Sequence, residues 1–265
     1  VYFFECLAAS RTSRCRKQHM ITNGVIVLGG AQMVPTKRLL PCLRALIELV
    51  ANYGCSVVLC TATQPAFNGM LGRKGFAVRE IAPAPSELFK KLKRVSYRFD
   101  GVLGDDDLAA RLADRDQSLC IVNSRQQARR LHELLDGAGS YHLTTLMHPV
   151  HRERVLNEIR QRLREGRTCR VVATSLIEAG VAVDFPAVYR ALAGVDRMVQ
   201  AAGRCNREGR PSAEESIVHV FEPADDYALP SDVAQQVAIA RSVLSEIEGA
   251  ASESCDIGAP EAIDA

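Results

Sequence analysis

Short apolar runs alternate with amphipathic helical stretches along most of this chain, and few folds accommodate that pattern. Such alternation is typical of α/β domains, in which helices cover both faces of a parallel sheet. The second half of the chain predicts strands at residues 120–123, 141–145, 170–174, 188–192 and 217–221, and helices at 124–135 and 149–165. We expect these elements to form one doubly wound domain.

A shorter segment of the same kind comes first. It predicts a strand at residues 25–28, a helix at 38–53 and a second strand at 56–61. Two prolines and the charged run 90–94 follow, which indicates a linker. We therefore predict four parts, namely a partial first α/β domain at 1–82, a linker at 83–112, a complete second domain at 113–225, and the start of a C-terminal region at 226–265.

The composition limits the classes of protein to which the chain can belong. A net charge of only +2 gives no general attraction for nucleic acid, so any such binding must come from local patches. Nine cysteines without a C-x-x-C pair favour reduced core thiols, which predicts a cytoplasmic protein. No apolar run approaches the ~20 residues of a membrane span, so we expect no membrane partner. His148 and His151 lie three residues apart but lack a third ligand, so no metal site is predicted.

The segment Gln200-Ala-Ala-Gly-Arg-Cys-Asn-Arg207 carries the clearest chemical signal. We predict a short helix here, whose spacing places Gln200, Arg204 and Arg207 on one side. Two neighbouring guanidiniums would stabilise the charge that develops on a phosphate during its transfer. An arginine-bearing solvated helix is the alternative for this segment alone.

Several further motifs accompany this segment in a fixed order. They are Gly29-Gly-Ala-Gln32, Cys60-Thr-Ala-Thr-Gln-Pro65, Ile121-Val-Asn-Ser124 and Ala173-Thr-Ser-Leu-Ile-Glu-Ala-Gly-Val181. The series resembles that of superfamily 2 helicases, and most closely the CRISPR-associated helicase-nuclease that degrades DNA for type I, Cascade-type surveillance complexes. The resemblance covers nearly the whole chain and implies two RecA-like domains of the P-loop NTPase helicase fold, the first of them truncated here.

The resemblance also implies roles for individual residues. ATP and Mg²⁺ would be the cofactors, with Arg204 and Arg207 as the phosphate-sensing pair and Gln200 orienting them. Gln32, Glu178, Gly180 and Gly203 would lie on the nucleotide side. Thr61 and Thr63 would couple the nucleotide to DNA, and Ser13, Arg14, Arg16, Asn123, Ser124 and Thr174 would lie near the phosphates of single-stranded DNA. Alternatives remain: Thr63 closes a turn, Ser124 only caps a helix, and the basic residues form a solvated face.

Departures from the family pattern predict that catalysis is impaired. Gly29 and Gly30 stand where the family has an acidic pair that holds Mg²⁺ and orients water, and Ala182 stands where it usually has aspartate. Turn chemistry is the alternative explanation for the glycines. The chain also lacks a G-x-x-x-x-G-K-[ST] loop and a His-Asp dipeptide.

Two kinds of function fit these observations. The chain is either part of an ATP-driven DNA helicase whose missing helicase and nuclease parts are supplied in cis or in trans, or a non-catalytic remnant that binds single-stranded DNA or a Cascade partner. A DNA-repair or RNA helicase of the same superfamily is a third reading. In each case we expect no ATP hydrolysis by this chain alone.

Overall fold

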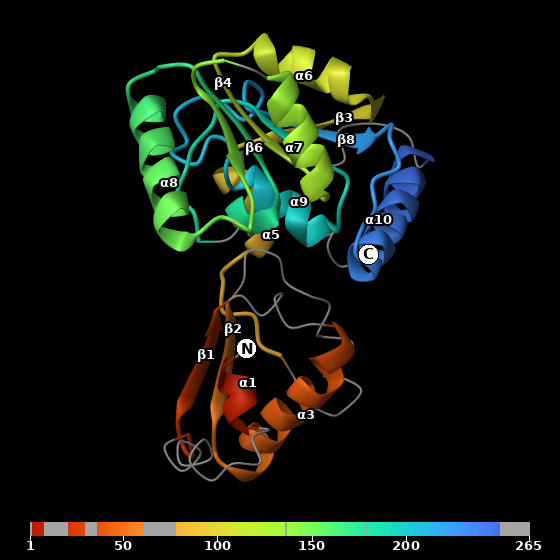
Figure 1. The fold of residues 1–265 in the computed structure, drawn as a ribbon. Helices are drawn as coiled ribbons and strands as arrows, with labels where there is room; N and C mark the ends of the chain where they lie inside the picture. The colour runs from red at the N-terminus through yellow and green to blue at the C-terminus, as the bar shows by residue number, and fades with distance from the viewer. Residues whose placement is uncertain are drawn as a thin grey trace. The chain divides into compact units, whose positions relative to one another are not determined.

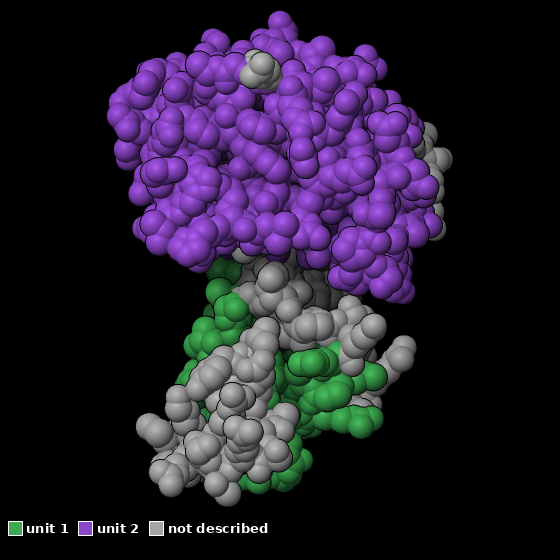
Figure 2. All heavy atoms as spheres, in the orientation of Figure 1, with its two compact units in different colours: residues 1–86, 263–265 green, residues 87–262 purple. Residues whose placement is uncertain are grey.

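The computed structural model describes residues 2–7, 21–29, 36–60, 78–135, 137–178 and 180–249. The chain divides into two compact units, residues 1–86 with 263–265 and residues 87–262, coloured separately in Figure 2. Several residues with predicted roles lie outside the described residues, namely Ser13, Arg14, Arg16, Gly30, Gln32, Thr61 and Thr63.

The first unit contains a two-stranded parallel sheet with helices against it. Its elements are α1 (Tyr2–Leu7), β1 (Val25–Gly29), α3 (Thr36–Asn52) and β2 (Ser56–Cys60). Ile26 packs with Leu49 and Cys55 in a small core. The neighbouring side chains of Val25 and Val27 are 70% and 64% exposed, because alternate residues of a strand face opposite sides of its sheet. One side of β1 is therefore covered and the other is open to solvent.

The second unit is built on a six-stranded sheet in which every pair of neighbours is parallel, in the order β3-β8-β7-β4-β6-β5. Strands β3, β4, β6 and β8 are labelled in Figure 1. The strands are β3 (Ser96–Leu103), β4 (Gln117–Ile121), β5 (Ser140–Leu143), β6 (Cys169–Ala173), β7 (Val188–Ala191) and β8 (Ile217–Pro223). The helices are α5 (Pro85–Leu92), α6 (Asp105–Ala113), α7 (Arg125–Leu134), α8 (Pro149–Arg164), the 3-10 turn η3 (Ser175–Ile177), α9 (Val195–Ala202) and α10 (Ser231–Gly249). This is the doubly wound α/β sheet that the alternation predicts.

Alternation along the central strands supplies a core on each face of this sheet. Cys120 faces the side covered by α6 and α7, where it packs with residues such as Leu108 and Leu131. Leu119 and Ile121 face the other side, which α8 covers through residues such as Ile159. At the β8 side, α10 packs through Ala240 and Leu244 on Leu192 and Val220. The described strands therefore bury apolar side chains on both faces, as central parallel strands do.

The structure differs from the prediction at residues 83–112, which were expected to form a linker. Residues 96–103 form β3, which pairs with β8, and α6 follows directly. The charge of Asp100, whose side chain is 2% exposed, is balanced inside the domain. Arg111 donates to its Oδ2 at 2.9 Å, and His219 Nδ1 lies 2.9 Å from the same oxygen. Because His219 is distant in sequence, Asp100 resembles a loop residue when the sequence alone is considered.

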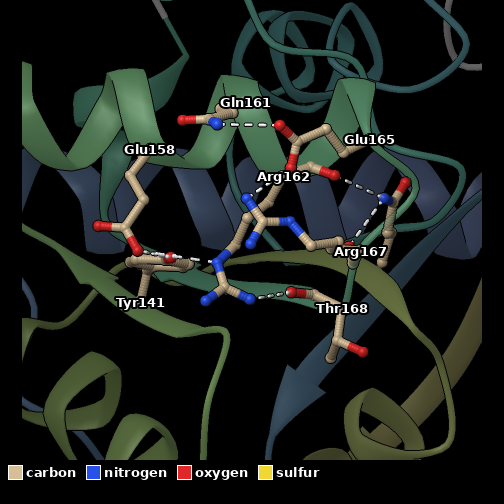
Figure 3. Close-up of polar contacts among 8 residues, drawn as sticks. Tyr141, Glu158, Gln161, Arg162, Glu165, Arg167 and Thr168 are labelled. Atoms are coloured by element: carbon tan, nitrogen blue, oxygen red, sulfur yellow. Dashed lines mark hydrogen bonds and ion pairs between the residues drawn. The ribbon is translucent and has the colours of Figure 1, made fainter.

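Polar contacts hold the end of α8 against the amino-terminal edge of the sheet (Figure 3). The Tyr141 hydroxyl donates to Glu158 at 2.5 Å, and the Arg162 guanidinium lies over the Tyr141 ring and donates to the Thr168 carbonyl at 3.2 Å. Burial and the Glu158 carboxylate raise the pKa of Tyr141 to about 12, so this hydroxyl stays a donor. The network fixes α8 at the edge opposite to the one that carries the predicted site residues.

Candidate functional site

The candidate site lies at the carboxyl edge of the sheet, where β4 and β6 end side by side. Ile121 pairs with Ala173, and the Val122 amide donates to the Ala173 carbonyl at 2.9 Å. The residues that follow these strands, Asn123 with Ser124 and Thr174, are consequently brought to one edge. This is the edge at which open α/β sheets bind their ligands.

Ser124 begins helix α7 as its N-cap. Its backbone is extended, with φ −112° and ψ 136°, and its Oγ accepts from the Gln126 amide at 3.2 Å. The predicted capping role is therefore confirmed. The first residue of α7, Arg125, is exposed. A cation there is unfavourable for the helix, because the helix N-terminus already carries partial positive charge. The Arg125 guanidinium and the helix N-terminus together attract anions.

Thr174 follows the last residue of β6 at this edge. It is 7% exposed, and its Oγ1 has no hydrogen-bond partner among the residues that the structure describes. Its amide donates to the Leu143 carbonyl at 3.1 Å, which joins the ends of β6 and β5. A buried hydroxyl without a partner carries a desolvation cost of about 1–3 kcal/mol that a ligand could relieve.

The Asn123 carboxamide is held by the protein on both sides. Its Nδ2 donates to the Leu192 carbonyl at 2.7 Å, and its Oδ1 accepts from Arg190 Nη1 at 2.8 Å. Arg190 is fully buried on β7, and its Nη2 lies 2.9 Å from the Glu178 carboxylate. Sequence reasoning overlooked Arg190, although an arginine inside the apolar run 188–193 is a signal, since buried charges need partners.

Glu178 is consequently engaged within the domain. Its side chain is 5% exposed, and burial raises the pKa of its carboxyl, against the opposing effect of Arg190 and Arg197. The same burial lowers the pKa of Arg190, against the effect of Glu178. Glu178 was expected to lie on the nucleotide side. In the structure its carboxylate is paired with Arg190 inside the sheet domain.

The arginine segment is not one helix, which corrects the expectation that Gln200, Arg204 and Arg207 share a helical face. Helix α9 ends at Ala202, with Gly203 as its C-cap. Beyond it, Cys205 forms a parallel β-bridge with Phe185, because the Phe185 amide donates to the Arg204 carbonyl at 2.9 Å. The tertiary bridge overrides the helical spacing.

The two arginines have different surroundings. Arg204 is 9% exposed, and its guanidinium donates to the carbonyls of Ile177 at 2.9 Å, Glu178 at 2.6 Å and Gly203 at 3.3 Å. Burial lowers its pKa first, and the charge of Arg207 lowers it further. Arg207 is exposed, and its guanidinium has no hydrogen bond or ion pair with the described part of the chain. Of the two guanidiniums, that of Arg207 is therefore the more accessible to a ligand.

Asp184 is used by the loop that carries Arg207. Its carboxylate accepts from the amides of Arg207 at 2.7 Å and Glu208 at 3.2 Å. Asp184 therefore does not take the place of the aspartate that the family usually has at position 182. Ala182 itself is exposed, and its carbonyl accepts from Arg160 Nε at 3.2 Å. Gly180, with φ +73°, adopts a left-handed conformation that suits glycine.

Gly29, the last residue of β1, has no steric reason to be glycine. A Cβ placed there would meet nothing within 4 Å among the residues that the structure describes, and its φ is not among the positive values found. The described structure therefore gives no turn requirement for this glycine. Its partner Gly30 lies outside the described residues.

The described residues do not make up a complete ATP–Mg²⁺ site. Neither Gly29 nor Ala182 supplies a carboxylate, Arg204 donates to backbone carbonyls, and no group of three metal-ligating side chains occurs within the described ranges. The cysteines described, including Cys120 and Cys169, are all free thiols. Within the same ranges, every helix is too short or too polar to cross a bilayer.

Comparisons with known proteins agree with the resemblance. Residues 114–210 match the family model described as "CRISPR-associated nuclease/helicase Cas3, C-terminal". The curated CRISPR-associated nuclease/helicase Cas3 of Methanothermobacter thermautotrophicus is 29% identical over 196 residues, which cover 68% of this chain and 24% of that protein. The chain thus spans about a quarter of this relative.

Solved structures match the fold. The crystal structure of T. fusca Cas3-ATP superposes with a TM-score of 0.67 at 18% identity, over 91% of this chain and 34% of that one. A CRISPR RNA-guided surveillance complex in a pre-nicking state gives 0.61 at 18% identity, over 90% of this chain and 36% of that one. S. cerevisiae Dbp5 bound to RNA and ADP BeF3 gives 0.50 at 15% identity, over 83% of this chain and 56% of that one. These structures share the parallel α/β fold of this chain, and the family model and the curated relative show that part of the chain is similar to Cas3.

Proposed function

We propose that this chain is part of a Cas3-type helicase that moves along single-stranded DNA with ATP in CRISPR defence, and that the edge formed by Asn123, Ser124 and Thr174 contacts the DNA phosphates. The single observation that carries the DNA contact is the start of α7, where a capping serine and the exposed Arg125 stand at the positive end of a helix. Helix N-termini bind phosphate through amides and dipole without reading bases.

The ATP side of the proposal concerns the arginine loop. Arg207 would face the phosphates, while Arg204 would shape the loop through the carbonyls of Ile177 and Glu178. The acidic groups for Mg²⁺ and the phosphate loop would have to come from elsewhere. A surveillance complex is the proposed partner, since one of the similar structures is such a complex.

DNA binding is tested with a matched pair of variants on α7. Arg125→Gln and Arg130→Gln remove the same charge from exposed positions of one helix, but only the first lies at its start. We expect Arg125→Gln to weaken binding of fluorescent oligo(dT) about tenfold by anisotropy, as for one hydrogen bond to a charged group, and Arg130→Gln to change it little. Binding should weaken as salt rises.

The same pair separates function from stability. Arg125→Gln should leave α7 as stable or stabilise it by about 0.3–1 kcal/mol, because it removes a cation from the positive end of a helix. No binding by the wild-type chain at low salt would remove the DNA assignment. Tighter binding to oligo(U) than to oligo(dT) would favour the RNA-helicase reading.

A non-catalytic remnant is the second candidate, favoured by Gly29, which has room for a side chain yet carries none. On that reading the purified chain hydrolyses no ATP with or without oligo(dT). A DNA-stimulated turnover that Arg207→Ala lowers by about 10³-fold, as for loss of an arginine finger, would exclude it.

A further inference from the structure

Arg190 is a fully buried arginine that serves two segments of the candidate site. Its Nη1 donates to Asn123 Oδ1 at 2.8 Å, to the Ala191 carbonyl at 2.8 Å and to the Ile121 carbonyl at 3.3 Å. Its Nη2 pairs with Glu178 at 2.9 Å. One guanidinium thus touches the end of β4 and the turn that follows β6.

The network continues from Glu178 to the arginine loop. The Glu178 side chain pairs with Arg190, and its carbonyl accepts from Arg204 Nη2 at 2.6 Å. Asn123, Arg190, Glu178 and Arg204 therefore form a continuous chain of polar contacts inside the domain. It joins the edge proposed for DNA to the loop proposed for phosphate.

Stability alone gives little reason to keep this ion pair. Burying two charges costs several kcal/mol per ion, and apolar residues of similar volume are often as good or better. The neighbours of Arg190 on β7, Val188, Tyr189 and Ala191, are all buried, so an apolar side chain would suit this strand. What an apolar residue cannot do is orient Asn123.

Orientation of the Asn123 carboxamide depends on the arginine. The Arg190 donor requires the Asn123 oxygen to face it, and the Leu192 carbonyl requires the amide nitrogen on the other side. Only one Nδ2 hydrogen is used by Leu192, so the second remains for a ligand within the described contacts. Without Arg190, the Leu192 carbonyl would be the one described group left to hold the carboxamide, and the Asn123 oxygen would lose its described partner.

We propose that Arg190 is a positioning residue that locks the Asn123 carboxamide for a phosphate of single-stranded DNA and ties it, through Glu178, to the Arg204 loop. This inference rests on the proposed function. The guanidinium itself touches no ligand, because it is 0% exposed.

The test removes the contact between Arg190 and Asn123 without leaving an unpaired charge inside the domain. Arg190→Met alone would strand the buried Glu178 charge, so the informative variant is the double change Arg190→Met/Glu178→Gln. The matched control is Arg111→Met/Asp100→Asn, which removes another ion pair of the same unit, between the buried Asp100 on β3 and the more exposed Arg111 on α6. Circular dichroism and urea unfolding report the fold, and anisotropy with oligo(dT) reports binding, for the full chain.

We expect the Arg190/Glu178 double variant to remain folded and to bind oligo(dT) about tenfold more weakly, while the control pair binds like wild type. Adding Asn123→Ala to the Arg190/Glu178 variant should cause no further loss, although Asn123→Ala alone should weaken binding. A folded double variant that binds like wild type overturns the inference and leaves the proposed function standing. Absence of binding by wild type overturns the proposed function itself.

If the double variant does not fold, Arg190→Lys decides. Lysine keeps a charge but has a single nitrogen, so it cannot reach Glu178 and Asn123 in the way that Nη2 and Nη1 of Arg190 do together. Weakened binding by folded Arg190→Lys supports the positioning role, and unchanged binding overturns it.

Discussion

Ser124 serves the fold and the proposed DNA contact with the same oxygen, so its two roles can be separated by choice of substitution. Ser124→Ala should lower the free energy of unfolding by about 1 kcal/mol, because the Gln126 amide loses its cap. Ser124→Asp should keep the stability, since aspartate caps well and suits a helix N-terminus, yet bind oligo(dT) more weakly through repulsion of phosphate. Urea unfolding and anisotropy measure the two effects. Wild-type affinity in Ser124→Asp would contradict a phosphate contact at this end of α7.

Gly29 is the second residue whose role a substitution can decide. Its φ is not positive and a Cβ there has open space, so Gly29→Ala should raise the free energy of unfolding by about 0.5–1 kcal/mol by removing freedom from the unfolded chain. Gly29→Asp should be tolerated for the same steric reason. Urea unfolding of both variants checks this. A clear loss of stability in Gly29→Ala would restore the turn explanation.

At the scale of elements, two histidines couple α7 to the edge strand β5. His132 and His142 stack with their ring centroids 5.6 Å apart. Burial, then the charges of His132 and Arg129, lower the pKa of His142 below its ordinary value near 6.5, against the opposing effect of Glu133. The unfolded chain therefore binds this proton more readily than the native one, so the free energy of unfolding should fall as the pH drops below about 6.5.

The corresponding experiment compares urea unfolding at pH 7.5 and 5.5. His142→Gln should lose less stability than wild type over this interval, because the group that resists protonation in the fold is gone. His151→Gln, at an exposed position of α8, serves as the control and should lose as much as wild type. An equal loss in His142→Gln would show that β5 is not acid-sensitive through this pair.

Elements with continuous apolar runs could be predicted, and those stabilised by distant partners could not. The strands predicted at 170–174 and 217–221 overlap β6 and β8 and differ from them only at their ends. Consecutive apolar residues made them predictable, because they suit a sheet that is buried on both faces. β3 was missed because Asp100 depends on Arg111 and His219, although Val95, Tyr97 and Phe99 alternate as in a strand. Helix α9 was extended too far because the bridge between Cys205 and Phe185 has no local signal.

At the scale of the whole molecule, order of motifs carried more information than any single residue. The motifs around Asn123, Thr174 and Arg204 predicted the RecA-like fold, and the structure brings the first two to one sheet edge. Sequence could not show that Arg204 donates to the carbonyls of Ile177 and Glu178 while Arg207 is exposed, since both arginines share one motif. Nor could it show the link through Arg190, which depends on strand order, with β7 beside β4.

The two units differ in how completely their sheets are covered. This difference predicts which unit is stable as a separate fragment. Residues 87–249 contain the six-stranded sheet with cores on both faces, whereas the first unit has two described strands and leaves Val25 and Val27 exposed. Two-stranded sheets have marginal stability on their own.

We expect a fragment of residues 87–249 to unfold in one cooperative urea transition and to bind oligo(dT) within about threefold of the full chain, an affinity change of less than 1 kcal/mol. A fragment that folds but does not bind would move the DNA contact to residues 1–86, and a fragment without a cooperative transition would mean that the second unit depends on the first.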